Sequence, residues 1–340
     1  MSRSRTGPGP DASPVLPGPQ GGPPAADVPA APSPGTLSRM TDAPTWPRAA
    51  GRGPVVVLGK LVADAVLELS EPLVVGGQQR VVRTTTAGGA PANVTSGLAR
   101  LGVPAVLAGW AGADPLADGL LAGLAARGVD LAVVRRGRTP LATVLVHPDG
   151  ERTLLSDRGD GGLEPDDVAG VPLPGTAVLH LDGYDLLRFP DALAAAADRA
   201  HGAGVPVSLD VAAATRVRAH GAEDYAGSVR RLRPDLLLCN AAEARVLGLE
   251  PDGDLPPWAP DLVVVHAGPE PTAVRTRGGT WRVPVPPVPV PVRDTTGCGD
   301  ALAAGVLAGW RAGDPVLDAV RGGHAAAAVV AGVIGAQPPS

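Results

Sequence analysis

Short apolar runs alternate with alanine-rich segments of helical period from residue 54 onward. Runs such as 54–58 and 105–109 are uniformly apolar and end at glycine, which is typical of strands buried on both faces. A helical pattern follows at 115–127. This alternation predicts an α/β fold with a mostly parallel central sheet and helices on both faces. Further strands of the same kind are predicted at 131–134, 177–181, 206–209, 235–238 and 262–265.

Two other segments alternate apolar and polar positions and contain turn residues. Residues 65–86 have Gly76-Gly77 at their centre, and residues 143–155 enclose His147-Pro-Asp-Gly150. Proline, aspartate and glycine in this order favour a tight turn. Both segments are therefore predicted to form hairpins that stand off the main sheet.

The first 53 residues differ from the rest of the chain. They are crowded with Pro, Gly, Ala and Ser and show no hydrophobic period, so we expect a disordered tail at 1–53 and a folded region at 54–340. Met40 is the only methionine after Met1. One hypothesis is that translation begins at Met40, and the alternative is a genuine tail. Intact-mass measurement of the native protein distinguishes them.

Composition excludes several classes of protein. The net charge of −5 gives no basic surface for nucleic acid. Lys60 is the only lysine, so no Walker-type G-x-x-x-x-G-K-[ST] loop exists. Cys239 and Cys298 supply neither a disulfide framework nor zinc-ligand spacing, and a cytoplasmic protein is expected. The longest uncharged apolar run, 325–336, reaches only about two-thirds of a membrane span. It predicts a buried helix and no membrane partner.

The stretch Asp294-Thr-Thr-Gly-Cys-Gly-Asp300 precedes a long Ala/Leu/Val segment of helical type. Gly297 and Gly299 allow a tight turn whose N–H groups point at one spot, and a helix N-terminus favours an anion there. Asp300, in the first helical turn, could then take a proton from a hydroxyl that attacks a bound phosphate. The alternative is a glycine-rich loop that caps a buried helix. A Rossmann fingerprint does not fit, since its third glycine is missing.

Polar residues follow the predicted strands at the end where ligands bind in parallel sheets. They are Asp64, Asp182, Asp210, Asn240 and His266. In addition, Gly88-Gly-Ala-Pro-Ala-Asn93 opens a helical segment and places Asn93 in its first turn.

Gly88–Asn93 and Asp294–Asp300, in this order and at this separation, resemble the paired signatures of the ribokinase-like (PfkB) carbohydrate kinase family. Asn240-Ala-Ala-Glu243 resembles the family's N-x-x-E. The stretches 147–152 and 157–159 resemble its lid hairpin, and Gly335-Ala336 resembles its terminal Gly-Ala. The resemblance covers nearly all of 54–340. It implies a ribokinase-like three-layer sandwich with a small β lid, here near 65–87 and 140–158.

The resemblance also implies roles for individual residues. Asp300 would be the general base, and the backbone around Gly297, Cys298 and Gly299 the anion hole for the phosphoryl group. The implied sugar-binding residues are Asp64, Gly88, Gly89 and Asn93. The implied nucleotide-side residues are Asn240, Glu243, Gly268 and His324, with Glu243 organising Mg²⁺ through waters. Asp294 and Thr296 match positions that bind a monovalent cation, here K⁺.

The expected function is therefore ATP-dependent phosphorylation of a hydroxyl of a small sugar or sugar-containing metabolite. A nucleoside kinase is one alternative, with Trp110 or Tyr184 as the stacking platform. The other is a catalytically inactive sugar-binding regulator, against which the intact Asp300 argues. A homodimer through the lid is a further expectation.

Three departures from the family pattern are visible in the sequence. Cys298 replaces the usual alanine, and a thiol at a helix N-terminus is expected to have a lowered pKa and to be alkylated more slowly when ATP is bound. Pro271 stands where the nucleotide loop after Gly268 usually has its second glycine. Arg158-Gly-Asp-Gly161 replaces the common R-G-A-N.

Overall fold

The computed structural model describes residues 43–149, 151–250, 253–288 and 291–337. The chain divides into Met1–Arg39 and Met40–Ser340, and every described residue belongs to the second unit. Most of the predicted tail, and the choice of Met40 as a start, lie outside the described residues. Residues 43–53 are described and packed: Trp46 stacks on Trp310 with ring centroids 4.8 Å apart, and Arg48 pairs with Asp235 at 3.0 Å. The predicted boundary at residue 53 is therefore too late.

A nine-stranded sheet forms the centre of the described chain, in the order β13-β12-β11-β10-β9-β8-β1-β4-β5. The pairs from β11 to β5 are parallel, whereas β12 and β13 add an antiparallel edge. The strands are β1 Val55–Lys60, β4 Ala105–Ala111, β5 Val129–Arg135, β8 Val178–Asp182, β9 Val207–Asp210, β10 Leu236–Asn240, β11 Val263–Ala267, β12 Glu270–Thr276 and β13 Gly279–Val283.

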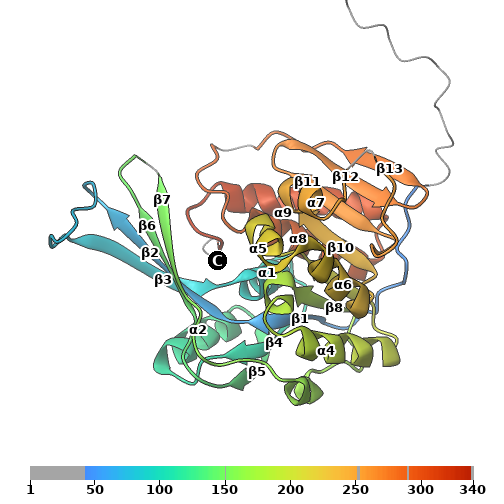
Figure 1. The fold of residues 1–340 in the computed structure, drawn as a ribbon, viewed down its shortest axis with the longest axis horizontal. Helices are drawn as coiled ribbons and strands as arrows, with labels where there is room; N and C mark the ends of the chain where they lie inside the picture. The colour runs from blue at the N-terminus through green and yellow to red at the C-terminus, as the bar shows by residue number, and fades with distance from the viewer. Residues whose placement is uncertain (1–42, 150, 251–252, 289–290, 338–340) are drawn as a thin grey trace, which may run out of the picture. The chain divides into compact units, whose positions relative to one another are not determined.

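Helices cover both faces of this sheet, which confirms the predicted three-layer fold (Figure 1). Side chains alternate along the strands, so Val56 and Leu58 pack in one core and Val55 and Val57 in the other. The second core contains α1 Ala90–Arg100, α8 Cys298–Ala312 and α9 Val316–Ala331. The first contains η1 Pro165–Gly170, α4 Pro190–Gly202, α5 Ala214–His220, α6 Ala222–Leu232 and α7 Ala241–Val246, and the short α3 Gly183–Leu186 follows β8.

A separate four-stranded sheet, in the order β3-β2-β6-β7, forms the lid (Figure 1). Its strands are β2 Val62–Leu69, β3 Val81–Gly88, β6 Leu141–Val146 and β7 Arg152–Asp157. Ala63 and Ala87 at its root pack against α2 Pro115–Ala126. Both predicted hairpins are thus antiparallel pairs, although Gly150 of the predicted turn lies outside the described residues.

Two regions differ from the sequence prediction. The antiparallel pair of β12 with β13, which ends at Val283, was not predicted. The buried helix expected at 325–336 is the second half of α9 and ends at Ala331. Within the described residues, no helix is long and apolar enough to cross a membrane.

Candidate active site

The carboxyl ends of β1, β8, β9 and β10 bring polar side chains to one edge of the large sheet. Lys60, Asp182, Asp210 and Asn240 are the last residues of these strands. All four side chains are at least partly buried. The strand ends therefore form the floor of a polar site. Asp182, Asp210 and Asn240 were predicted to lie at these ends, and Lys60 was not.

The loop before α8 has the geometry of a helix start that faces an anion. Gly297 is the N-cap in the left-handed region at φ 77°, and a Cβ there would lie 2.5 Å from the Cβ of Ala336, so only glycine fits. The Cys298 N–H donates to the carbonyl of Thr295 at 3.2 Å. Among the described residues, the N–H groups of Gly297, Gly299 and Asp300 have no backbone acceptor, which leaves three donors at a positive helix end.

The anion-hole prediction therefore needs a correction at Cys298. Its N–H closes the turn from Thr295 and is not available to a ligand in this conformation. The helix geometry requires this turn, because Gly297 enters α8 with a left-handed backbone. The donors left for an anion are Gly297 and Gly299, together with the first-turn N–H of Asp300.

Asn93 and Asp300 meet although they are far apart in the sequence. The Nδ2 atom of Asn93, in the first turn of α1, donates to Oδ2 of Asp300, in the first turn of α8, at 2.7 Å. Gly89 is the N-cap of α1 at φ 80°. A Cβ on Gly88 would lie 2.1 Å from Oδ2 of Asp64, so the Asp64 carboxylate rests directly on the Gly88 backbone. The two glycine motifs thus bring three predicted site residues together.

Burial raises the pKa of the carboxyl groups at this edge. The pKa of Asp300 rises to about 7, mainly through burial, with the Asn93 hydrogen bond opposing and the charges of Asp182 and Asp64 adding to the rise. Burial raises the pKa of Asp64 to about 6. Burial also raises the pKa of Asp210 well above its usual range, and the Glu243 charge adds to it. The Asp300 carboxyl thus has a pKa close to neutral pH.

Asn240 and Glu243 form a capping box at the start of α7. The backbone N–H of Asn240 donates to Glu243 at 2.8 Å, and its side-chain amide donates at 2.6 Å. Burial raises the pKa of Glu243 to about 7 despite these bonds. Within the described residues, no group of three or more His, Cys, Asp or Glu side chains is arranged to hold a metal directly. A single fixed carboxylate is compatible with Mg²⁺ that keeps its waters.

The predicted nucleotide-side residues Gly268 and His324 lie on different elements, the turn between β11 and β12 and the helix α9. Gly268 adopts φ 62° between β11 and β12, where a Cβ would meet nothing. The Nε2 atom of His324 lies 2.8 Å from the hydroxyl of Thr272, so that nitrogen is used inside the protein. The ring of His266 would lie 3.6 Å from a Cβ on Gly299, which places a strand-end histidine beside the α8 loop. The role of Gly268 and His324 with nucleotide stays a prediction.

Asp294 joins the α8 loop to the C-terminal segment. Its carboxylate accepts from the N–H of Thr296 at 2.7 Å and from the N–H of Gly335 at 2.8 Å. The residue is only 5% exposed. A buried carboxylate at this position supports the predicted cation site by its charge.

Comparison with known proteins adds to this geometry. The family model described as "pfkB family carbohydrate kinase" matches residues 54–340 of this chain. The chain belongs to the pfkB carbohydrate kinase family. It is therefore a phosphotransferase with an alcohol group as acceptor, and a sugar or nucleoside kinase within that family.

Three relatives illustrate the range of the pfkB family. An ATP-dependent ribose-1-phosphate kinase from Halopiger xanaduensis is 33% identical over 74% of this chain and 82% of its own. A fructokinase from Klebsiella pneumoniae is 30% identical over 76% of this chain and 85% of its own. The structure of adenosine kinase from Sinorhizobium meliloti matches with a TM-score of 0.73 at 24% identity, covering 85% of this chain and 97% of that one.

Lys60 lies among the polar strand ends of this pfkB kinase, and the sequence analysis did not predict it there. Its Nζ lies 2.8 Å from Asp185 and 3.4 Å from Asp182, and it stands 5.6 Å from the centre of the Tyr184 ring. Burial is the largest influence on the pKa of Lys60 and lowers it, yet the two aspartates raise the pKa overall. The sequence could have indicated this position, because Lys60 is the only lysine and lies just after the first predicted strand.

The pKa of the Cys298 thiol in this pfkB kinase differs from the value expected for a cysteine at a helix start. Burial raises its pKa, and the charges of Asp294 and Asp300 raise it further. The predicted lowering of the Cys298 pKa is wrong, because burial and the two neighbouring carboxylates favour the neutral thiol.

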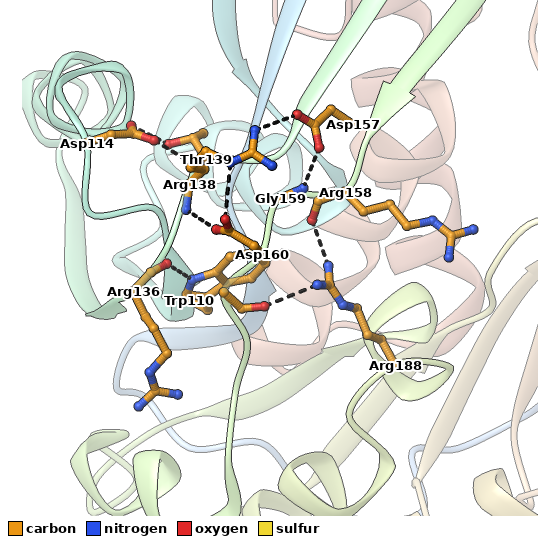
Figure 2. Close-up of polar contacts among 11 residues, drawn as sticks. Trp110, Asp114, Arg136, Arg138, Thr139, Asp157, Arg158, Gly159, Asp160 and Arg188 are labelled. Atoms are coloured by element: carbon orange, nitrogen blue, oxygen red, sulfur yellow. Dashed lines mark hydrogen bonds and ion pairs between the residues drawn. The ribbon is translucent and has the colours of Figure 1, made fainter.

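The root of the lid is held by a cluster of arginine contacts, which Figure 2 shows. Arg138 bridges Asp157 at 3.0 Å and Asp160 at 3.1 Å. Arg188 donates to the carbonyl of Arg158 at 2.8 Å, and the indole N–H of Trp110 donates to the carbonyl of Arg136 at 2.7 Å. These contacts fix the end of β7 beside the sheet while the Arg158 side chain turns away from the cluster (Figure 2).

Proposed function

We propose that this protein transfers the γ-phosphoryl group of ATP to a hydroxyl of a small sugar or sugar-containing metabolite, with Asp300 as general base. The observation that carries the proposal is the position of Asp300. It lies in the first turn of α8, next to the N–H groups of Gly297 and Gly299, which have no acceptor among the described residues, and it is hydrogen-bonded to Asn93 at 2.7 Å.

In the proposed reaction the acceptor hydroxyl binds between Asp64, Asn93 and Asp300. Asp300 accepts the hydroxyl proton as the oxygen forms its bond to the γ-phosphorus, and the bond to the β-phosphate oxygen breaks to release ADP. A carboxylate with a pKa of about 7 is a sufficient base, because the proton is lost late in phosphoryl transfer. The N–H groups at the start of α8 stabilise charge on the phosphoryl oxygens.

Cations complete the proposed site. Mg²⁺ would neutralise the ATP phosphates, and Glu243 and Asp210 would hold it through waters, since it binds one or two carboxylates and keeps several waters. Asn240 fixes the Glu243 carboxylate for this role. K⁺ would bind near Asp294 and Thr296, where it would raise the positive field at the α8 loop. Activity with K⁺ compared with Na⁺ at equal ionic strength tests this assignment.

A sugar is the preferred acceptor over a nucleoside. Trp110, one of the two proposed stacking platforms, is 0% exposed and lies inside the core. Tyr184 remains, exposed at 42%, with Lys60 beside its ring. Replacing Tyr184 by alanine therefore separates the two classes: it should raise KM strongly for a nucleoside acceptor and little for a plain sugar.

Arg158 supports an acceptor that carries a phosphate. Ser156 pairs with Ala142, which pairs with Asp64, so these side chains share one face of the lid, and Arg158 follows two residues later. Its exposed guanidinium has no hydrogen bond or ion pair with any described residue. The relative that is a third identical is a ribose-1-phosphate kinase by name. Arg158→Met should raise KM for a sugar phosphate more than for the matching free sugar.

The decisive test of the proposed function is ATP consumption across a panel of sugars, sugar phosphates and nucleosides. Asp300→Asn should keep ATP binding and lose at least ~10²-fold in turnover, the scale of a positioned base. Asp130→Asn, at an exposed carboxyl on β5, is the matched control. An Asp300→Asn variant with normal turnover would remove the base assignment, and no turnover with any acceptor would favour the sugar-binding regulator.

The lid also supports a homodimer. Apolar side chains are exposed on its strands and the loops between them, and a second copy could cover them. They are Leu73, Val74, Val75, Val81, Val82, Leu154 and Leu155. Sedimentation of the wild type and of Val82→Asp tests the dimer.

A further inference from the structure

Gln337 connects the Asn93 amide to an arginine at the end of α2. Its Nε2 donates to the carbonyl of Ala87 at 2.7 Å and to Oδ1 of Asn93 at 3.2 Å. Its Oε1 accepts from Nη1 of Arg127. Asn93 in turn donates to Asp300 at 2.7 Å. A continuous chain of hydrogen bonds thus runs from Arg127 to Asp300.

The chemistry of the two ends fixes the direction of every amide in this chain. A guanidinium can only donate and a backbone carbonyl can only accept, so Gln337 must turn its oxygen to Arg127 and its nitrogen to Ala87. That same nitrogen meets Asn93, which must present its oxygen there. The NH₂ group of Asn93 is then the group that faces Asp300. The reversed amide would set an oxygen against the carboxylate.

We propose that Gln337 is a positioning residue that acts through Asn93, holding the Asn93 amide so that it donates to the base Asp300. This inference rests on the proposed function for its kinetic consequence. Its geometric content is independent of that function, because the orientation of Asn93 changes the environment of the Asp300 carboxyl whether or not a substrate is known.

Several ionisable groups act on the Asp300 carboxyl besides Asn93. Asp64, Asp182 and Asp210 contribute charge from β2, β8 and β9, and Tyr184 and Cys298 also interact with it electrostatically. Behind Asn93 lies a cavity of about 190 Å³, lined by Arg100, Arg127 and Gln337 among others. A test of Gln337 must therefore separate its hydrogen bonds from a general change of charge.

Two substitutions test the donor function of Gln337, and Gln337→Met does so without a change of charge, whereas Gln337→Glu also adds a negative charge. Gln337→Met keeps most of the volume and removes all its hydrogen bonds. Gln337→Glu keeps an acceptor for Arg127 but cannot donate to Asn93, so the Asn93 amide should turn and present its oxygen to Asp300. Carboxyl-carbon NMR of the ligand-free full chain, assigned with Asp300→Asn, should show the Asp300 titration rising by about one pH unit in Gln337→Met, the scale of one hydrogen bond to a charge. The rise should be larger in Gln337→Glu.

The kinetic readout is the pH profile of kcat/KM. In Gln337→Met it should fall about tenfold at pH 6 and return toward the wild-type value at pH 9, since the base is then ionised in both proteins. A loss that is equal at all pH values would indicate a merely structural role and would overturn the proposal.

Two controls complete the experiment. Arg100→Met removes a guanidinium from the same cavity but leaves the chain of hydrogen bonds from Arg127 to Asp300 intact. It should therefore leave the Asp300 titration unchanged. In an Asn93→Ala background, Gln337→Met should add no further shift, because residues that act in series are non-additive. If Asn93→Ala moves the titration and Gln337→Met does not, the inference is wrong. If no acceptor is phosphorylated at all, the proposed function fails, while the NMR titration still decides the role of Gln337.

Discussion

Replacing Asp300 by asparagine is expected to stabilise the ligand-free protein at pH 8 while it removes the base. Burial raises the pKa of this carboxyl from 3.8 to about 7, so its ionised form destabilises the folded state. The penalty is absent below about pH 4, where the carboxyl is protonated in both states. It grows as the pH rises through the window from 3.8 to about 7 and is complete above that window.

The size of the effect follows from the pKa difference. A rise of about three units corresponds to about 4 kcal/mol at most, at about 1.4 kcal/mol for each unit. The Asp300 side chain is only partly shielded from water, and solvent screening reduces this figure. We therefore expect Asp300→Asn to raise the free energy of unfolding by about 1–3 kcal/mol at pH 8 and by only about a quarter of that at pH 4.5.

Urea unfolding followed by tryptophan fluorescence at the two pH values measures this difference. Asp130→Asn, at an exposed carboxyl on β5, is the control and should show no such pH dependence. Equal stability changes for Asp300→Asn at both pH values, or a loss at pH 8, would show that the buried carboxylate is not the source of the penalty.

Three further predictions concern packing and reactivity. In Gly305→Ala the new Cβ would lie 2.6 Å from the Cα of Gly323, so denaturation should show a loss of about 1–3 kcal/mol, whereas Gly123→Ala, where a Cβ meets nothing in α2, should gain about 0.5–1 kcal/mol. Trp46→Ala removes a stacked ring and should cost at least about 1 kcal/mol in the same assay. Iodoacetamide should label Cys298 slowly at pH 7 and faster as the pH rises past 9, by mass spectrometry, because its pKa is raised and the thiolate is the reactive form.

Much of the fold could be predicted from the sequence because a parallel sheet has a simple pattern. Strands buried on both faces are short apolar runs, and β1, β4, β8, β9 and β10 all fell where such runs occur. The β12 strand was missed because its Glu270-Pro-Thr start and Arg275 lack that pattern. Arg275 is nevertheless buried and donates to the carbonyl of Gly253, a contact that the sequence alone does not show.

The site was predictable to the extent that its residues belong to local motifs. Asp300 and Asn93 each follow a glycine pair that must start a helix, so their positions were readable from the sequence. Their contact with each other was not, since it depends on how α1 and α8 pack. Gln337 gave no signal at all, because a lone glutamine near the end of an alanine-rich stretch has no local pattern.

The charge of the assembled edge explains why cations belong to the proposed reaction. Carboxylates gather there at Asp64, Asp210 and Glu243 as well as Asp300, while both ion pairs of Lys60 go to Asp182 and Asp185. Two like charges about 6 Å apart repel by about 3 kcal/mol at an effective dielectric constant of about 20, and ATP brings a triphosphate to this edge. Protonation of the carboxyls and binding of Mg²⁺ relieve the same repulsion. Because Glu243 and Asp210 are proposed to hold Mg²⁺ as carboxylates, protons compete with the metal for the same charge. The Mg²⁺ concentration needed for half-maximal ATP binding should therefore rise as the pH is lowered from 8 to 6.5, and a fall would contradict this role of the two carboxylates.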